Sequence, residues 1–269
     1  MDFETKYITT DIKISEFKGD RYKTEHAFSE HLLAWLIAGE TKVILGESTV
    51  QFAAGDVFLI PQYQVATFIN SSTNGQYHKA VAMLLGPERL KAYYANHVPV
   101  AGDANDRHVI KFGTHPLLES CLASLIPYFD VKDPFPEEIA SLKITEAISV
   151  LRVVDPCIDG ILSNFEEPGK LPLVEYMEKH FMYNLPLEKF GYLTGRSLST
   201  FNRDFRKAFQ ETPQRWLTRK RLELAHYRIK ESRMRPAEVF MEVGFEDLSH
   251  FSFAFKKHFG YAPSSMQGS

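Results

Sequence analysis

The C-terminal third of the chain contains one sixteen-residue segment twice, at a distance of fifty residues. The first copy is LSTFNRDFRKAFQETP (198–213) and the second is LSHFSFAFKKHFGYAP (248–263). A segment that recurs in this way indicates that one supersecondary unit is built twice. Seven of the sixteen positions are identical, namely Leu198/Leu248, Ser199/Ser249, Phe201/Phe251, Phe205/Phe255, Lys207/Lys257, Phe209/Phe259 and Pro213/Pro263.

Each copy predicts an amphipathic helix that follows a shorter one. Phe201, Phe205 and Phe209 recur at every fourth position, which places the three rings on one helix face that must be buried. A glycine precedes each copy, Gly195 after LPLEKFGYLT and Gly244 after RPAEVFMEV. A short helix, a glycine-containing turn and an amphipathic second helix form the plan of the helix-turn-helix motif.

The opposite face of the first repeated helix carries residue types suited to base recognition. Ser199, Asn202 and Arg203 lie at i, i+3 and i+4. Asn forms paired hydrogen bonds with adenine, and Arg forms them with guanine. Between the copies, the segment 213–231 predicts one continuous helix that holds the two units at a fixed separation. A single match would be weak evidence, whereas two with shared spacing predict two readers, each covering one groove segment.

Charge divides the chain into two parts. Residues 170–269 contain 17 Lys and Arg against 11 Asp and Glu, a net charge of +6. Residues 1–169 contain 14 against 23, a net charge of −9. This division favours contact of the C-terminal part alone with a polyanion. An ordinary solvated surface would also explain the charge, so nucleic-acid binding is predicted mainly from the repeat.

The region 172–266 resembles the DNA-binding domain of the AraC/XylS family of bacterial transcription regulators. The resemblance rests on RLELA (221–225), VGF (243–245) and the second repeat copy. It implies two helix-turn-helix units whose recognition helices enter successive major-groove segments of double-stranded DNA. The DNA-binding residues expected from it are Ser199, Thr200, Asn202, Arg203, Arg206 and Lys207 in the first unit, and Ser249, His250, Ser252, Phe253, Lys256 and Lys257 in the second.

The chain departs from the family pattern at two positions of the second unit. Phe240 stands where a small residue is usual, so the packing of that unit must adjust. Phe253 stands where Arg is common. A phenyl ring donates no hydrogen bond to a base edge or a phosphate, although it packs against a thymine methyl group. We therefore expect the first unit to supply most of the base specificity.

The N-terminal part predicts an antiparallel sandwich or small barrel followed by helices. Apolar or alternating runs broken by Gly, Asn and Ser predict several short strands over 31–85. Residues 115–129 and 136–154 show helical spacing. The stretch 55–70 resembles the second motif of cupin barrels through Gly55, Pro61 and Asn70.

The cupin resemblance lacks its metal chemistry. Ala66 occupies the position of the family's metal-binding His, and Tyr63 that of its second Gly. No metal or other cofactor is therefore expected, with a site built from the scattered His26, His31 and His78 as the alternative. Regulators of this type often place such a barrel ahead of the DNA-binding domain as an effector pocket and dimerisation unit. The candidate pocket residues are Trp35, Tyr63, Phe68 and His78, each of which would also serve as plain core.

The segment 136–154 predicts a helix that is apolar on two faces. One stripe runs from Ala140 through Ile144 and Leu151, and four apolar residues lie off it. One face would cover its own domain, and the other would bind a second copy of the chain; a fully internal helix is the alternative. The candidate dimerisation residues are Ile139, Leu142, Val150 and Val153.

Gly160, Pro168, Gly169 and Pro172 predict a linker over 159–171. The expected organisation is a cupin-like regulatory and dimerisation domain over 1–158 and an all-α DNA-binding domain over 172–269, giving a multidomain α+β protein. The polar first residues predict no signal peptide, no run is long enough for a membrane span, and the two cysteines fit a reducing cytoplasm.

The sequence thus predicts a cytoplasmic transcription factor and not an enzyme, since motifs for nucleotide, serine-nucleophile and zinc chemistry are missing. Its expected partners are double-stranded DNA, a small-molecule effector, a second copy of the chain and RNA polymerase. Control of the barrel by a protein partner, and a cupin-fold enzyme with an appended helical domain, are the alternatives. The effector, the target sequence and the choice between activator and repressor are not encoded in any motif.

Overall fold

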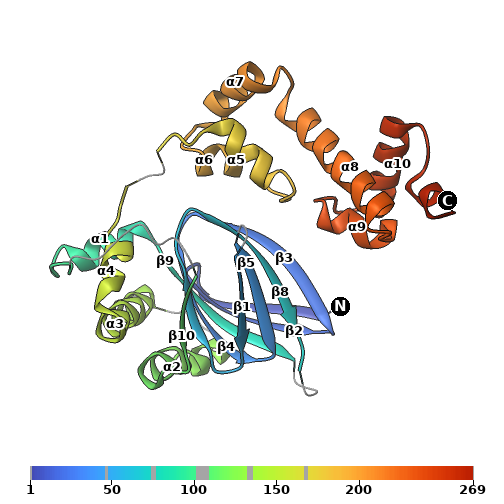
Figure 1. Ribbon diagram of the computed structural model, residues 1–269. Coiled ribbons are helices and arrows are strands. Elements are labelled where there is room, and N and C mark those ends of the chain that lie inside the picture. Colours follow the sequence, from blue (N-terminus) through green and yellow to red (C-terminus); the bar gives the residue numbers. More distant parts are fainter. Residues whose placement is uncertain are drawn as a thin grey trace. The chain divides into compact units, whose positions relative to one another are not determined.

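The computed structural model describes residues 2–45, 48–73, 77–100, 109–131, 136–166 and 169–268. It divides into two compact units, Met1–Glu166 and Glu167–Ser269 (Figure 1). The boundary falls inside the predicted linker, of which residues 167–168 lie outside the described residues.

The first unit is built on two antiparallel sheets. One sheet has the order β1(Asp2–Thr9), β2(Ile12–Lys18), β9(His78–Leu85), β4(His31–Ala38), β7(Val57–Ile60) and β10(Ile110–Gly113). The other has the order β3(Arg21–Phe28), β8(Gln64–Ser71), β5(Glu40–Leu45) and β6(Ser48–Ala53). The predicted β-rich domain is confirmed. Among the described residues, no ladder joins the two sheets into a closed barrel.

The central strand β4 separates two hydrophobic cores because successive side chains point to opposite sides of a sheet. Leu33 and Trp35 pack toward the helices, in a cluster with β2, β7 and β9. Leu32, Ala34 and Leu36 pack instead against the four-stranded sheet. A strand buried on both faces reads as a continuous apolar run, which explains the sequence HLLAWL.

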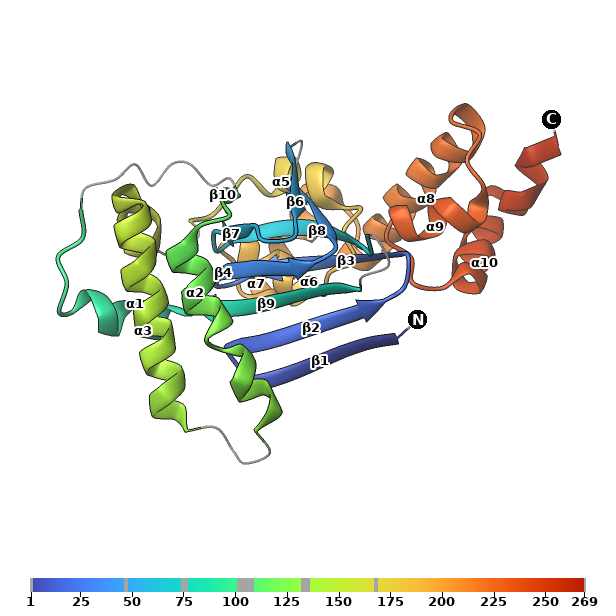
Figure 2. The same ribbon diagram turned by 90° about the horizontal axis from the view of Figure 1, so that it is seen from below.

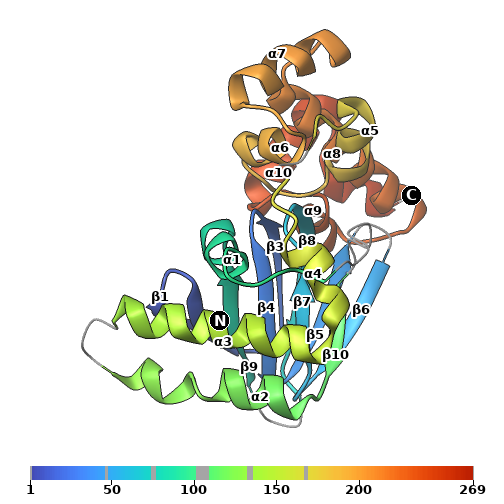
Figure 3. The same ribbon diagram turned by 90° about the vertical axis from the view of Figure 1, so that its left-hand side faces the viewer.

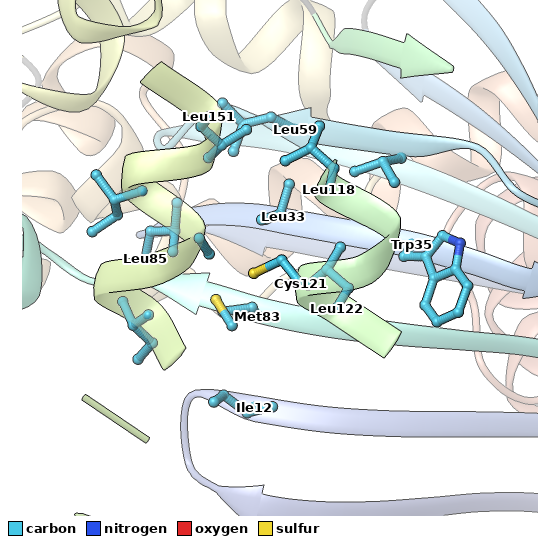
Figure 4. Packing of buried hydrophobic residues seen from close by; sticks show 14 of the residues in the cluster. Ile12, Leu33, Trp35, Leu59, Met83, Leu85, Leu118, Cys121, Leu122 and Leu151 are labelled. Atoms are coloured by element: carbon cyan, nitrogen blue, oxygen red, sulfur yellow. The ribbon is translucent and has the colours of Figure 1, made fainter. Parts of the chain in front are cut away.

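The helices α1(Pro87–Tyr94), α2(Pro116–Ala123) and α3(Glu137–Val154) pack on the outer face of the six-stranded sheet (Figure 2). The short α4(Asp159–Leu162) adds Leu162 to the same core. α2 and α3 lie side by side (Figure 3). Leu151 of α3 and Leu118 of α2 meet the sheet residues Leu33, Leu59 and Met83 (Figure 4).

The second unit is helical and contains two small cores. Its helices are α5(Leu173–His180), α6(Leu187–Leu193), α7(Leu198–Phe209), α8(Pro213–Glu231), α9(Pro236–Glu242) and α10(Leu248–Phe259). Trp216 and Leu217, near the start of α8, pack with α5, α6 and α7. Leu222, Ala225 and Ile229, further along α8, pack with α9 and α10. The predicted single helix over 213–231 is therefore confirmed, and it takes part in both cores.

The structure adds elements that the sequence analysis missed. The strands β1, β2 and β3 precede the predicted strand region, and β10 follows it. The first four residues of the predicted linker form α4, where Asp159 and Leu162 are fully buried. Nε of Arg152 on α3 lies 2.8 Å from the Asp159 carboxylate. Residues 159–162 thus belong to the first unit.

Candidate functional site

The two predicted recognition helices have matching ends. At the start of α7, the Ser197 side chain accepts a hydrogen bond from the Thr200 amide at 3.3 Å. At the start of α10, Asp247 accepts one from the His250 amide at 2.7 Å. Both helices end at a residue in the left-handed region, Gln210 and Gly260. Such N-caps and left-handed C-caps satisfy backbone groups that a helix leaves free at its ends, so the two copies begin and end alike.

The two helices also bury the same face. Phe201 and Phe205 are fully buried in α7, and their counterparts Phe251 and Phe255 are fully buried in α10. From these residues to the C-caps, the alternation of buried, half-buried and exposed positions is identical in the two copies. The repeat in the sequence is therefore a repeat in three dimensions, with one face of each helix left open.

The open face of α7 carries polar donors. Ser199 and Arg203 are exposed, and Asn202 is half-buried. The Asn202 side chain donates to the Leu198 carbonyl at 3.0 Å, and the Arg203 guanidinium donates to Asp204 at 3.3 Å. Both contacts are local and would have to be exchanged when the side chains turn to a base edge.

The carboxylate of Asp204 links α7 to the turn before it. It accepts hydrogen bonds from Arg196 at 3.2 Å and from Arg203. Burial alone would raise the pKa of Asp204, but the hydrogen bonds and charges of the two arginines outweigh it and lower the pKa. Asp204 therefore remains ionised and holds Arg203 on the exposed face.

The open face of α10 is less polar. Ser249 and His250 are exposed and Ser252 is half-buried, while Phe253 has 69% of its surface exposed. At the far end of both helices the exposed basic residues recur: Arg206 and Lys207 in α7, Lys256 and Lys257 in α10. All twelve residues expected to bind DNA thus lie on α7 and α10; nine of them are exposed, and Thr200, Asn202 and Ser252 are half-buried.

A cavity of about 330 Å³ lies between the two sheets of the first unit. This volume falls in the range of small-molecule sites. Phe68 and His78 line it, as the sequence analysis expected. Trp35 does not, because it points from the opposite face of β4 into the core under the helices. Tyr63 is also outside the lining and lies in the turn between β7 and β8.

One end of the cavity is a buried polar network. The Thr41 hydroxyl donates to Oδ1 of Asn70 at 3.0 Å and lies 2.8 Å from Nε2 of His78. A hydroxyl has one proton, so Nε2 of His78 must be the donor in the second contact. Burial lowers the pKa of His78 to about 4, which keeps its ring neutral at pH 7.

Lys13 is a charged pocket residue that the sequence analysis missed. It lines the cavity from β2, and burial lowers its pKa. Within the part of the chain that the structure describes, no carboxylate forms an ion pair with it. The pKa of His26, which lies on the same cavity, is lowered by burial and by the charge of Lys13. The cavity therefore combines an apolar wall with one unneutralised cation.

The helix α3 matches its predicted stripe and splits the four candidate dimerisation residues. Ala140, Ile144 and Leu151 are buried in the first unit. Leu142 and Val153 are exposed at 67% and 71%. Ile139 and Val150 are half-buried, and Val150 packs against the core of its own unit, so it is not part of a free face. A narrower apolar surface of Leu142 and Val153 remains.

The described ranges contain neither a cluster of metal ligands nor a membrane-spanning helix. No group of three or more His, Cys, Asp or Glu residues is placed to hold a metal ion there. His26 and His78 share the cavity, whereas His31 accepts a hydrogen bond from the Gln62 amide at 3.1 Å and does not line it. No described helix is long and apolar enough to cross a bilayer.

Two family models match parts of the chain. A helix-turn-helix domain matches residues 193–269, and the ExsA N-terminal regulatory domain matches residues 31–151.

Curated relatives match over part of their length. The HTH-type transcriptional regulator ExsA from Pseudomonas aeruginosa is 29% identical over 163 residues, which are 60% of this chain and 58% of the relative. The virulence regulon transcriptional activator VirF from Yersinia enterocolitica is 26% identical over 60% of each protein. The HTH-type transcriptional activator RhaS from Escherichia fergusonii is 30% identical over 35% of this chain and 34% of the relative. The matched part of the chain thus spans about three fifths of the length of the first two relatives.

Among solved structures, an apo ToxT variant from Vibrio cholerae aligns over 95% of this chain and 96% of its own, with 12% identity and a TM-score of 0.47.

Proposed function

Because the chain belongs to the AraC/XylS family of transcription regulators, we propose that it binds double-stranded DNA at specific sequences and regulates the genes beside them. The observation that carries this proposal is the repeated open face: α7 and α10 bury equivalent phenylalanines and expose equivalent positions. A cytoplasmic location, where the DNA lies, follows from this activity. RNA polymerase is the protein partner that such an activity requires.

In this mechanism, each recognition helix enters one major-groove segment. Asn202 and Arg203 of α7 offer the donors that read adenine and guanine edges. The exposed basic pairs Arg206/Lys207 and Lys256/Lys257 contact phosphates, which positions the protein without carrying sequence information. The net positive charge of residues 170–269 supports attraction to the duplex.

We also propose that the cavity between the sheets binds a small effector with an apolar body and an anionic group. The apolar wall, the buried polar network at His78 and the unneutralised Lys13 support this chemistry. A ligand anion beside Lys13 would return the electrostatic stabilisation that the side chain lost on leaving water. Control of this unit by a protein partner is the alternative, and the cavity favours the small ligand.

Dimerisation through Leu142 and Val153 of α3 is the third part of the proposal. Two large apolar side chains that stand three turns apart on one exposed helix face are typical of a helix that packs against a partner.

Sequencing of genomic DNA bound by the purified full chain tests the central activity. We expect a recurrent motif with two segments about one helical turn apart. Bound fragments with no enriched motif would contradict sequence-specific binding.

A further inference from the structure

Arg221, near the middle of α8, joins the two helix-turn-helix units through three carbonyl groups. Its Nε donates to the Phe181 carbonyl at 2.9 Å, and its Nη2 donates to the Tyr183 carbonyl at 2.7 Å. Its Nη1 donates to the Gly244 carbonyl at 3.1 Å. The first two carbonyls follow α5 in the first helix-turn-helix unit. Gly244 is the turn glycine of the second helix-turn-helix unit. One side chain therefore contacts the backbone of both units.

Gly244 lies in close contact with the segment 181–183 of the first helix-turn-helix unit. Gly244 has a φ of +89°, and a Cβ atom there would lie 2.5 Å from the Met182 carbonyl oxygen and 3.0 Å from Nε of Arg221. Gly260 has nearly the same φ, +87°, but a Cβ there would meet nothing within 4 Å. The left-handed backbone thus accounts for glycine at both positions, and the close approach of segment 181–183 is particular to Gly244.

Two further contacts flank the arginine. Nζ of Lys220 lies 2.6 Å from the Glu178 carboxylate on α5. Nδ2 of Asn184 donates to the Glu246 carboxylate at 2.6 Å, which links the α5–α6 connection to the α9–α10 turn. Both partly exposed contacts are individually weak. The Lys220–Glu178 ion pair fastens α5 to α8, and the Asn184–Glu246 contact, together with Arg221, connects the two helix-turn-helix units directly at two points.

We propose that Arg221 is a positioning residue that fixes the separation and rotation of α7 relative to α10, and with it the spacing between the two half-sites that the protein accepts on DNA. α8 joins the two helix-turn-helix units, and each unit packs on it through apolar side chains, whose contacts are non-directional. The planar guanidinium, with donors pointing in fixed directions, defines the orientation of three carbonyls at once. The consequence for DNA rests on the proposed function. The clamp, by which we mean the three hydrogen bonds from the Arg221 guanidinium to the carbonyls of Phe181, Tyr183 and Gly244, rests on the structure alone.

The dependence of DNA affinity on half-site spacing distinguishes a positioning role of Arg221 from a role in folding stability alone. One base pair of insertion moves a half-site by about 3.4 Å and rotates it by about 34°. A rigid protein cannot follow both changes, so we expect the wild type to lose about tenfold or more in affinity, as for a mismatched base pair. Arg221→Met keeps the side-chain stem and removes the donors. We expect it to bind the original spacing more weakly and to discriminate between the two spacings less than threefold.

Arg219→Met is the matched control, because Arg219 lies on the same helix and pairs with Glu211 and Glu223 instead. It should retain the wild-type discrimination. Gly244→Ala should act like Arg221→Met, whereas Gly260→Ala should act like the control. Arg221→Met with undiminished spacing discrimination would overturn the proposal.

A distance measurement keeps the clamp testable apart from DNA. Spin labels at Arg206→Cys and Lys257→Cys, in a Cys157→Ser background of the full chain, report the separation of α7 and α10. The wild type should give one narrow distance distribution, and Arg221→Met a distribution at least twice as wide. Equal widths would refute the clamp even if wild-type DNA binding failed and the proposed function with it. A circular dichroism spectrum shows whether each variant remains folded.

Discussion

Arg203 on α7 and Phe253 on α10 occupy equivalent positions of the two helix-turn-helix units, and both side chains are exposed to solvent. Each stands two residues after a fully buried phenylalanine, Phe201 or Phe251. The backbone and the buried neighbours of the two positions are thus equivalent, but the side chains differ chemically. Arg203 offers five hydrogen-bond donors, whereas Phe253 offers an apolar ring. We therefore predict that the two helix-turn-helix units recognise DNA bases unequally.

Removal of the guanidinium at Arg203 should cost specific binding. We expect Arg203→Ala to weaken binding to the preferred site by about 1–3 kcal/mol, the value of one bidentate base contact, and to relax the preference at one base pair. A competition assay with a panel of single-base variants measures both effects. Unchanged preference at every base pair would show that Arg203 does not read a base.

Lys256→Ala is the contrasting variant for that assay. If its exposed ammonium group contacts a phosphate, the substitution should weaken binding to all sequences alike and reduce the salt slope by about one unit.

A charge placed on the exposed face of α3 should dissociate the dimer. We expect the wild type to sediment as a dimer at tens of micromolar, and Leu142→Glu and Val153→Glu to sediment as monomers, because two like charges would face each other in an apolar contact. Val174→Glu on α5, also an exposed apolar position, should leave the dimer intact. A monomeric wild type at this concentration would refute the interface.

The cation in the cavity should select for a ligand anion. Two dyes test this, anilinonaphthalene sulfonate and the uncharged phenylnaphthylamine, which share an apolar body. Lys13→Met should weaken sulfonate binding by about tenfold, equivalent to about 1.4 kcal/mol, and leave the uncharged dye unaffected. Lys42→Met, on β5 but outside the cavity lining, is the control. Equal loss for both dyes would indicate a change of cavity shape and contradict a charge contact.

Burial of His78 should make the free energy of unfolding of the β-rich unit, Met1–Glu166, depend on pH in the acidic range. Its pKa is about 4 in the folded chain, because of burial, and about 6.5 when unfolded. Between these values the unfolded chain takes up a proton that the folded chain does not, so stability should fall as the pH drops from 6.5 to 4, by at most about 1.4 kcal/mol per pH unit. Above pH 6.5 this contribution is constant.

Urea unfolding followed by tryptophan fluorescence measures this effect. In a Trp216→Phe background, Trp35 reports on the first unit alone, since the chain has two tryptophans. His78→Gln should reduce the pH slope by about one proton. A slope that the substitution leaves unchanged would contradict the assignment of this titration to His78.

Most helices of the helical unit, Glu167–Ser269, could be predicted from the sequence, whereas the cavity of the β-rich unit could not. The same amphipathic pattern occurs twice in this unit, and Phe201 in α7 and Phe251 in α10 indicate which face of each helix is buried. In β4, apolar residues fill both faces, so no pattern in the sequence indicates that Ala34 borders the cavity and Trp35 packs under the helices. Lys13 reaches the cavity only because β2 pairs with the distant strand β9, where it lies opposite Ala82. Such nonlocal register has no local signal.

The central claim, that two like-folded units read DNA unequally, is tested most directly by randomising each half of a bound site separately. The full chain is used to select from both libraries, and Arg203→Ala identifies the half that α7 reads. We predict that the half read by α7 yields a defined sequence and that the half read by α10 remains degenerate, with at most an A/T preference from Phe253 against thymine methyl groups. Equal information content in both halves would contradict the account.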